Sequence, residues 1–151
     1  MEYSHNDTEL VKQPIGYWSW AAHKAVVTNI RTGLAQFDVT QPQWWVLNQV
    51  ATSESGRTRE EVTNVLKGYL DVGAALAEEI DVLLGRDLLA LDTENRLRLT
   101  SEGDTVYRQC AERQTAMRKQ AHDGISDEEY LITLKVLQRM IHNVGGEAWH
   151  H

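Results

Sequence analysis

The stretch from residue 58 to residue 99 constrains the fold most, because it carries two short amphipathic segments with a hairpin pattern directly behind them. Apolar residues recur at helical spacing in both segments. They are Val62, Val65 and Leu66 in the first, and Leu76, Ile80, Leu83 and Leu84 in the second. A break near Asp71 to Gly73 separates the segments. Two short helices joined by a tight turn that contains glycine are typical of a helix-turn-helix.

The hairpin pattern begins immediately after the second of these helices. Residues 88–91 (LLAL) predict a strand, residues 92–95 (DTEN) have the composition of a turn, and residues 97–99 (LRL) alternate as a return strand. A hairpin in this place is a wing. The whole stretch therefore predicts a winged helix-turn-helix.

A long apolar stripe precedes this unit. From Pro14 onward, apolar residues recur every three or four positions, namely at Ile15, Trp18, Ala22, Val26, Ile30, Leu34 and Phe37. The pattern predicts one amphipathic helix that is about 34 Å long, at roughly 1.5 Å per residue. A helix of this length cannot bury its whole stripe against one small domain, so we expect it to pack against a partner subunit.

Local capping signals place the starts of the other helices. A threonine or serine followed three residues later by glutamine or glutamate is a capping box. The chain has three of them: Thr40–Gln43, Thr58–Glu61 and Ser126–Glu129. Thr100 caps a long helix that extends to about His122, and the last helix stops at Gly145-Gly146. The predicted fold class is mainly α with a small β-wing.

The composition fits a small globular protein of the cytoplasm. The 151 residues are 42% hydrophobic and 25% charged, which is enough to bury a core. The single cysteine, Cys110, excludes an intrachain disulfide and fits a reducing compartment. No run of about 18 apolar residues occurs, so we expect no membrane span. The polar residues 1–13 predict a flexible N-terminal arm.

The sequence carries no signal for catalysis or metal binding. Its six histidines lack the spacing of a closed zinc site, and it has neither a glycine-flanked nucleophile elbow nor a phosphate-binding loop. We therefore expect no enzyme activity, no cofactor and no metal. Cys110 is either an oxidant sensor or a plain buried thiol. Arg108 and Arg113 favour a reactive thiolate while Glu112 opposes one, and the buried thiol is the favoured interpretation.

Three local stretches, taken in order, resemble the MarR family of bacterial regulators. Residues 39–47 (VTQPQWWVL) resemble the family's entry into its second helix, with valine in place of the first leucine. Residues 97–103 (LRLTSEG) resemble the last wing strand and its exit. Residues 125–129 (ISDEE), followed by 134–137 (LKVL), resemble the final helix. Together they place the resemblance over roughly residues 14–145.

The resemblance implies a domain organisation and a function. Residues 1–13 would be a flexible arm, residues 14–38 and 101–151 a helical dimerisation region, and residues 39–100 a winged helix-turn-helix that binds double-stranded DNA. The protein would be a ligand-responsive homodimeric transcriptional regulator, and we expect a repressor. Each subunit would bind one half of a palindromic operator, with half-sites about 34–36 Å apart.

The resemblance also implies a set of DNA contacts, and each arginine in it has a solvated surface charge as its alternative role. The residues are Gly73, Ala74, Ala75 and Ala77 of the second helix of the helix-turn-helix (the reading helix), Arg57 and Arg59 at the start of the preceding helix, and Arg96 and Arg98 of the wing. Alanines touch thymine methyl groups but form no bidentate contacts with bases.

The charge of this region argues against strong DNA binding. Residues 55–100 contain six basic and nine acidic side chains, for a net charge of −3, and the whole chain has a net charge of −7. Glu78, Glu79 and Asp81 lie in the reading helix itself. Because an acidic surface repels phosphates, an alternative function stays open: a winged-helix protein that has lost strong DNA binding and binds a protein or small molecule instead.

Aromatic residues gather in the first two predicted helices. In the resembled family, small aromatic ligands bind between the dimer arm and the winged helix, and such ligands need an apolar pocket with a few polar groups. Trp18 and Trp44 lie on apolar stripes and are assigned to core packing. The residues off the stripes are candidate ligand contacts, with dimer packing as the alternative: Tyr17, Trp20, His23 and Trp45.

Overall fold

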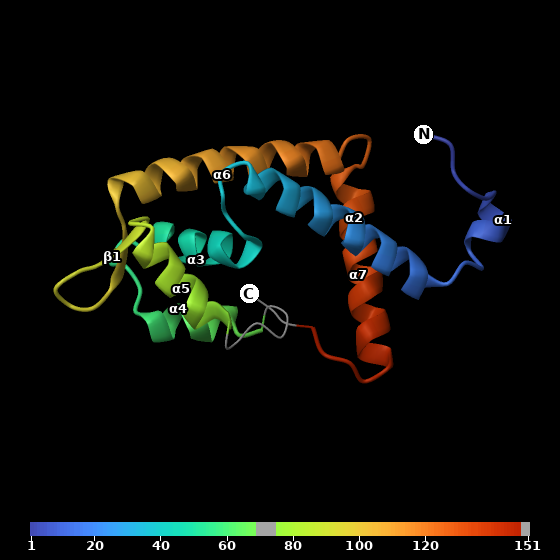
Figure 1. Ribbon diagram of the computed structural model, residues 1–151. Coiled ribbons are helices and arrows are strands. Elements are labelled where there is room, and N and C mark those ends of the chain that lie inside the picture. The colour runs from blue at the N-terminus through green and yellow to red at the C-terminus, as the bar shows by residue number, and fades with distance from the viewer. Residues whose placement is uncertain (69–74, 149–151) are drawn as a thin grey trace.

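The computed structural model describes residues 1–68 and 75–148 and confirms the predicted fold class, since helices dominate and the one sheet of the described part has two antiparallel strands (Figure 1). The elements are α1 (Asp7–Leu10), α2 (Ile15–Ala35), α3 (Gln41–Ala51), α4 (Arg59–Leu66), α5 (Ala75–Gly85), β1 (Leu89–Leu91), β2 (Leu97–Leu99), α6 (Ser101–Ala121) and α7 (Asp127–Asn143). No helix among the described residues has both the length and the apolar composition needed to cross a membrane.

The helix starts follow the capping signals in the sequence. All three predicted capping boxes are formed, at Thr40–Gln43, Thr58–Glu61 and Ser126–Glu129. Thr100 caps α6, because its side-chain oxygen accepts a hydrogen bond of 2.9 Å from the backbone N–H of Gly103. Each cap satisfies backbone donors that the first turn of a helix leaves unpaired.

The buried core lies inside the winged helix-turn-helix, with α3 at its centre. Helix α3 packs against α5, α6 and β2. The core side chains come from every element of this unit and also from α2 and α6; they include Leu34, Val46, Leu47, Val62, Leu66, Leu76, Ile80, Leu83, Leu89, Leu97 and Cys110. The two strands pair in the register Leu89 with Leu99 and Leu91 with Leu97.

The glycine of the LRLTSEG stretch is required by this packing. A Cβ atom at Gly103 would overlap the backbone carbonyl oxygen of Leu88, so the first turn of α6 lies directly on the start of the hairpin. Thr100 holds the same corner, because its hydroxyl donates a 2.6 Å hydrogen bond to the carbonyl oxygen of Asp87. Asp87 has a φ of 57°, a left-handed conformation that Asp and Asn adopt more readily than most residues.

The long helices leave most of their apolar residues uncovered. Helix α2 buries only Gly33 and Leu34, near its C-terminal end, and α7 buries none of its residues. Trp18, which the sequence assigned to core packing, is 38% exposed in the single chain. The other exposed apolar residues of the two helices are Ile15, Tyr17, Trp20, Val26, Leu131, Ile132, Leu134 and Met140. Figure 1 shows α7 and the first half of α2 at the end of the molecule away from the wing.

The N-terminal segment contains one short helix that the sequence did not predict. Asn6 caps α1 by accepting a 3.1 Å hydrogen bond from the backbone N–H of Glu9. The helix buries none of its residues, and Figure 1 shows it beyond the N-terminal end of α2. Hydrophobic periodicity gives no signal for a four-residue polar helix, because such a helix has no core-facing side.

Candidate nucleic-acid interface

Helix α5 has one face in the core and one face in solvent. Leu76, Ile80 and Leu83 are buried, whereas Ala75 and Ala77, two of the predicted DNA contacts, are exposed. Gly73 and Ala74, the other predicted contacts of the reading helix, lie outside the described residues. The first turn of the described α5 therefore presents small side chains outward, which permit close approach of another surface, and the exposed residues Glu78, Asp81 and Val82 follow them.

An ion pair joins α5 to the helix before it. Arg59, the first residue of α4, lies 2.7 Å from the carboxylate of Asp81, measured between Nη2 and Oδ1. The side chains are 42% and 65% exposed, so solvent reaches both. The predicted phosphate contact Arg59 is thus on the surface, and the charge of Asp81 is partly neutralised.

A second acid of α5 is half-buried. Glu79 accepts a 2.6 Å hydrogen bond from the side-chain amide of Gln43, a buried residue of α3. The sequence counted Glu78, Glu79 and Asp81 as equal charges on the reading helix. Two of these three acids therefore have partners within the fold, but the net charge of the segment stays the same, because Arg59 is already counted in it and the amide of Gln43 is neutral.

Arg96 lies against the loop before α4. Its guanidinium donates to the carbonyl oxygen of Gly56, over 3.0 Å from Nη2 and 3.3 Å from Nε. Nη2 also lies 3.3 Å from the carboxylate of Glu61. The side chain is 25% exposed, so this predicted wing contact with DNA also attaches the wing to the body of the fold.

Arg98 holds the wing turn and the same loop together. Its Nε donates to Asp92 over 3.0 Å, and its Nη1 donates to the carbonyl oxygen of Glu54 over 2.9 Å. Asp92 also accepts hydrogen bonds from the backbone N–H groups of Arg96 and Glu94, each over 2.9 Å. These bonds, with that of Arg96 N–H the largest cause and that of the Arg98 side chain next, lower the pKa of Asp92 below its usual value.

Arg57, in the loop before α4, forms an isolated bridge with β2. Its carbonyl oxygen accepts a 2.7 Å hydrogen bond from the N–H of Leu97, so it pairs with β2 as an antiparallel bridge. Its side chain donates over 3.0 Å to the carbonyl oxygen of Gln49 in α3. The neighbouring Gly56 has a φ of 72°, and a Cβ atom there would lie 2.7 Å from Nε of Arg98. Glycine is therefore required where the wing meets this loop.

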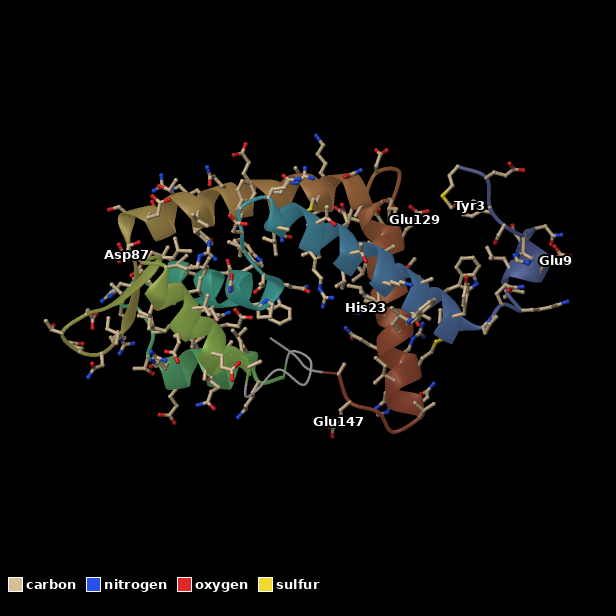
Figure 2. The ribbon with its side chains drawn as sticks, in the orientation of Figure 1. Tyr3, Glu9, His23, Asp87, Glu129 and Glu147 are labelled. Carbon is tan, nitrogen blue, oxygen red and sulfur yellow. The ribbon has the colours of Figure 1, made fainter. Side chains whose placement is uncertain are left out.

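The predicted ligand residues are distributed over two helices. Tyr17, Trp20 and His23 are exposed on α2, and Trp45 is half-buried on α3. The ring centroids of Tyr17 and Trp20 lie 6.2 Å apart, and the ammonium group of Lys24 lies 5.2 Å from the ring centroid of Trp20. Figure 2 places His23 midway along α2, far from Asp87 at the winged-helix end.

Two hollows occur elsewhere on the described surface. One of about 290 Å³ lies at the corner between α2 and α3, and Arg31, Gln41 and Pro42 are among its lining residues. The other, of about 890 Å³, lies beside the C-terminal half of α7 and includes Arg139 and His142. None of the four predicted ligand residues lines either hollow.

Cys110 is a buried free thiol. It is fully buried, and burial raises the pKa of its thiol from 9.0 to about 11. The reactive thiolate is therefore scarce at neutral pH. Within residues 1–68 and 75–148, no group of three His, Cys, Asp or Glu side chains is arranged to hold a metal ion.

Sequence reasoning missed two residues that connect the reading helix to the rest of the fold. Gln43 was recognised as a capping-box residue, but its second contact, with Glu79, was not. Arg86 donates a 2.6 Å hydrogen bond to the carbonyl oxygen of Asp38 and a 3.3 Å hydrogen bond to Oε1 of Gln43. The available signal was the spacing of Glu79 and Arg86, because residues seven apart lie on one side of a helix.

Structure comparison finds similar folds among known regulators, whereas sequence comparison finds no match. No protein-family model matches the chain, and no curated protein matches it. Among solved structures, the PcaV transcriptional regulator from Streptomyces coelicolor is 24% identical with a TM-score of 0.72, over 89% of this chain and 100% of that one.

Two further structures were solved with bound partners. CouR from Rhodococcus jostii bound to p-coumaroyl-CoA is 21% identical with a TM-score of 0.69, over 85% of this chain and 92% of that one. A MarR-family protein from Mycobacterium tuberculosis in complex with DNA is 14% identical with a TM-score of 0.65, over 85% and 98%. This chain therefore has the winged-helix fold of MarR-family transcriptional regulators.

Proposed function

We propose that this protein is a homodimeric, ligand-responsive regulator of transcription that binds a palindromic DNA operator and acts as a repressor in the cytoplasm. It works by binding and not by catalysis. Residues 39–100 are its DNA-binding unit, residues 14–38 and 101–151 form its dimerisation region, and residues 1–13 are an arm.

One observation carries the DNA-binding part of the proposal. The exposed face of α5 carries Ala75 and Ala77, and Arg59, 42% exposed, lies beside it on α4. Small outward residues let a helix enter the major groove, and a neighbouring arginine provides a phosphate contact. The pairing of Asp81 with Arg59 locally offsets one of the acidic charges on α5. A fold shared with a DNA-complexed protein adds support.

The dimer is supported by the uncovered faces of α2 and α7. Large apolar side chains such as Trp20, Ile132 and Leu131 are more than half exposed in the single chain. Exposed apolar side chains repeated along two long helices favour an interface, since burying them removes apolar area from water. A second copy of the chain is the occupant that gives two reading helices, as a palindrome requires.

The ligand-binding part of the proposal depends on this dimer. Tyr17, Trp20 and His23 of α2 and Trp45 of α3 provide aromatic surface with polar atoms, which suits a small aromatic ligand. The partner subunit would complete the pocket. Binding would favour one angle between the two winged helices, so that the half-site spacing no longer fits DNA.

The direct test is a fluorescence-anisotropy titration against DNA from around the protein's own coding region, at two salt concentrations. Because phosphate contacts release counterions, specific binding must weaken steeply as salt rises. The matched control is DNA of equal length and scrambled sequence. Tight binding that depends on sequence and salt supports the proposal. Equal binding to both DNAs, or none in a folded dimer at low salt, contradicts it.

A second candidate function is a winged-helix protein that binds a protein or small molecule and not DNA. The observation that favours it is the internal use of the four arginines proposed to meet DNA, because Arg57, Arg59, Arg96 and Arg98 all have partners within the fold. A folded dimer that binds no DNA at low salt would select this function.

A further inference from the structure

Gln43 is a buried amide that lies between the reading helix α5 and the corner between α2 and α3. It is the third residue of α3 and is 5% exposed. We propose that Gln43 is a positioning residue that fixes the orientation of the reading helix α5 relative to the corner between α2 and α3. The proposal rests on the proposed function, since it assigns Gln43 a role in DNA affinity although its side chain is buried.

The contacts of Gln43 use its amide in one orientation. Oε1 accepts a 3.1 Å hydrogen bond from the backbone N–H of Thr40 and a 3.3 Å hydrogen bond from Arg86. Nε2 donates a 2.6 Å hydrogen bond to the carboxylate of Glu79. The two donors, from Thr40 and Arg86, therefore face the amide oxygen of Gln43, and the acceptor, Glu79, faces its amide nitrogen. A carboxylate at this position would oppose Glu79, and an apolar side chain would leave three polar groups without this partner.

Two connections to one helix fix its direction better than one. Glu79 lies within α5. Arg86 lies seven residues further along the chain, directly after the last residue of α5. At a rise of about 1.5 Å per residue their backbones are roughly 10 Å apart along the axis. A single amide thus contacts side chains from two places along α5. Rotation or tilt of α5 would break at least one of these hydrogen bonds.

The other side of the network is the corner that ends α2. Arg86 also donates a 2.6 Å hydrogen bond to the carbonyl oxygen of Asp38. Asp38 has a φ of 53°, so the chain turns sharply between α2 and α3 at this residue. The path from α2 to the reading helix therefore runs through Asp38, Arg86, Gln43 and Glu79. A change in the direction of α2 acts on α5 through these contacts.

The test reverses the polarity of the hydrogen bond between Gln43 and Glu79 in two steps, first at Gln43 alone and then at both residues. Gln43→Glu places a carboxylate against Glu79 and should weaken DNA binding about tenfold, within the usual range of coupling between contacting residues. Glu79→Gln alone keeps an acceptor for the amide of Gln43 and should change affinity little. The double variant Gln43→Glu/Glu79→Gln exchanges donor and acceptor, and it should bind DNA within about threefold of wild type.

A distance measurement separates positioning from a general loss of stability. Spin labels at Thr32 of α2 and Val82 of α5, both exposed, report the orientation of α5 by pulsed dipolar spectroscopy. The labelled protein carries Cys110→Ala and is diluted with unlabelled protein, so that each pair reports one chain. Gln43→Glu should shift or broaden the distance distribution, and the double variant should restore it. Arg86→Met, at an exposed residue, should broaden it without unfolding the chain.

The matched control is Gln41→Glu. Gln41 lies in the same turn of α3 and is 9% exposed, and its Oε1 accepts a 3.2 Å hydrogen bond from Arg31 of α2. This hydrogen bond joins α3 to α2 and not to α5. The variant adds the same charge at similar burial, and it should leave both the distance between the labels and the DNA affinity close to wild type.

The outcomes separate this inference from the proposed function. An unchanged distance distribution in both Gln43→Glu and Arg86→Met overturns the role of Gln43, whatever happens to DNA binding. A changed distance with unchanged affinity, in a protein that binds DNA, also overturns it. If the wild type binds no DNA, the proposed function is wrong. The distances then still decide whether Gln43 orients α5.

Discussion

The guanidinium of Arg59 lies 2.7 Å from the carboxylate of Asp81, so a cation that would meet a phosphate is partly neutralised by the helix beside it. Both side chains are solvent-exposed, and exposed ion pairs contribute only about 0–1 kcal/mol. DNA can therefore compete for Arg59 at low cost. The pair acts on the electrostatics of the reading surface far more than on the stability of the fold.

Asp81→Asn is expected to strengthen DNA binding, because it frees Arg59 for a phosphate. The logarithm of the affinity should also fall more steeply with the logarithm of salt concentration, by about 0.9 if one further phosphate is neutralised. An anisotropy titration over a salt series measures both effects. Glu78→Gln removes the same charge from the same helix without releasing Arg59. Equal salt slopes in the two variants would contradict a masked phosphate contact.

Gly103→Ala is expected to destabilise the protein by about 1–3 kcal/mol, the usual cost of overpacking. The added Cβ would overlap the carbonyl oxygen of Leu88 and separate α6 from the hairpin. Urea unfolding gives the free energy directly. Gly85→Ala is the control, because a Cβ atom there meets nothing within 4 Å, and it should be neutral or slightly stabilising. Equal stability of the two variants would show that the corner relaxes.

Asp92→Asn should make the protein less stable near neutral pH, and this deficit should shrink in acid. The hydrogen bonds from the backbone N–H of Arg96 and the side chain of Arg98 lower the pKa of Asp92 in the folded protein below 3.8. A lowered pKa gives stability that is present above the unfolded value and lost as pH falls through the folded value. Thermal melting from pH 6 to pH 3 measures it. A deficit that does not change with pH would rule out this ionic contribution.

Cys110 should resist thiol reagents in the native protein and react once it is unfolded. Burial raises the pKa of the Cys110 thiol from 9.0 to about 11. The contribution of the neutral thiol to the stability of the folded protein is therefore complete below pH 9 and is lost as pH rises toward 11. The stability of wild type should fall relative to Cys110→Ala in this window, by at most about 1.4 kcal/mol per pH unit. Rapid labelling at pH 7.5 in the folded state would instead indicate a reactive thiol.

Ile132→Asp is expected to dissociate the proposed dimer. Ile132 lies on α7 and is 61% exposed in the single chain, so a charge there opposes burial against a second copy. Sedimentation velocity at micromolar concentration measures the change. Val82→Asp, at a 45% exposed residue of α5, is the control and should leave the dimer intact. Unchanged sedimentation of Ile132→Asp would exclude this face of α7 from the interface.

The sequence predicted the parts of the fold that depend on local chemistry. Capping boxes such as Thr58 with Glu61 lie within four residues, and each fixed the start of a helix. The wing was found because its turn residues, among them Asp92 and Asn95, lie directly between an apolar run that predicts a strand and an alternating return strand. Helix α1 was missed because its cap at Asn6 has no apolar stripe behind it.

The candidate site was less predictable because its contacts join residues distant in the chain. Arg96 meets Gly56 across 40 residues, and Gln43 meets Glu79 across 36. A sequence gives the charge of these side chains but not which partner each one meets. It therefore counted Glu79 as a repulsive surface charge, although in the fold this carboxylate is a hydrogen-bond acceptor for a buried amide.

The anchoring of the wing has a consequence for how this region can diverge among homologues. Arg57, Arg96 and Arg98 each donate to a main-chain carbonyl oxygen, at Gln49, Gly56 and Glu54 respectively. Every amino acid has a main-chain carbonyl, so the residue type at the acceptor positions can change without loss of the acceptor. Gly56 is the exception, because its backbone conformation requires glycine. The arginines have no such freedom. Substitutions of Gln49 and Glu54 should therefore be tolerated better than substitutions of the three arginines.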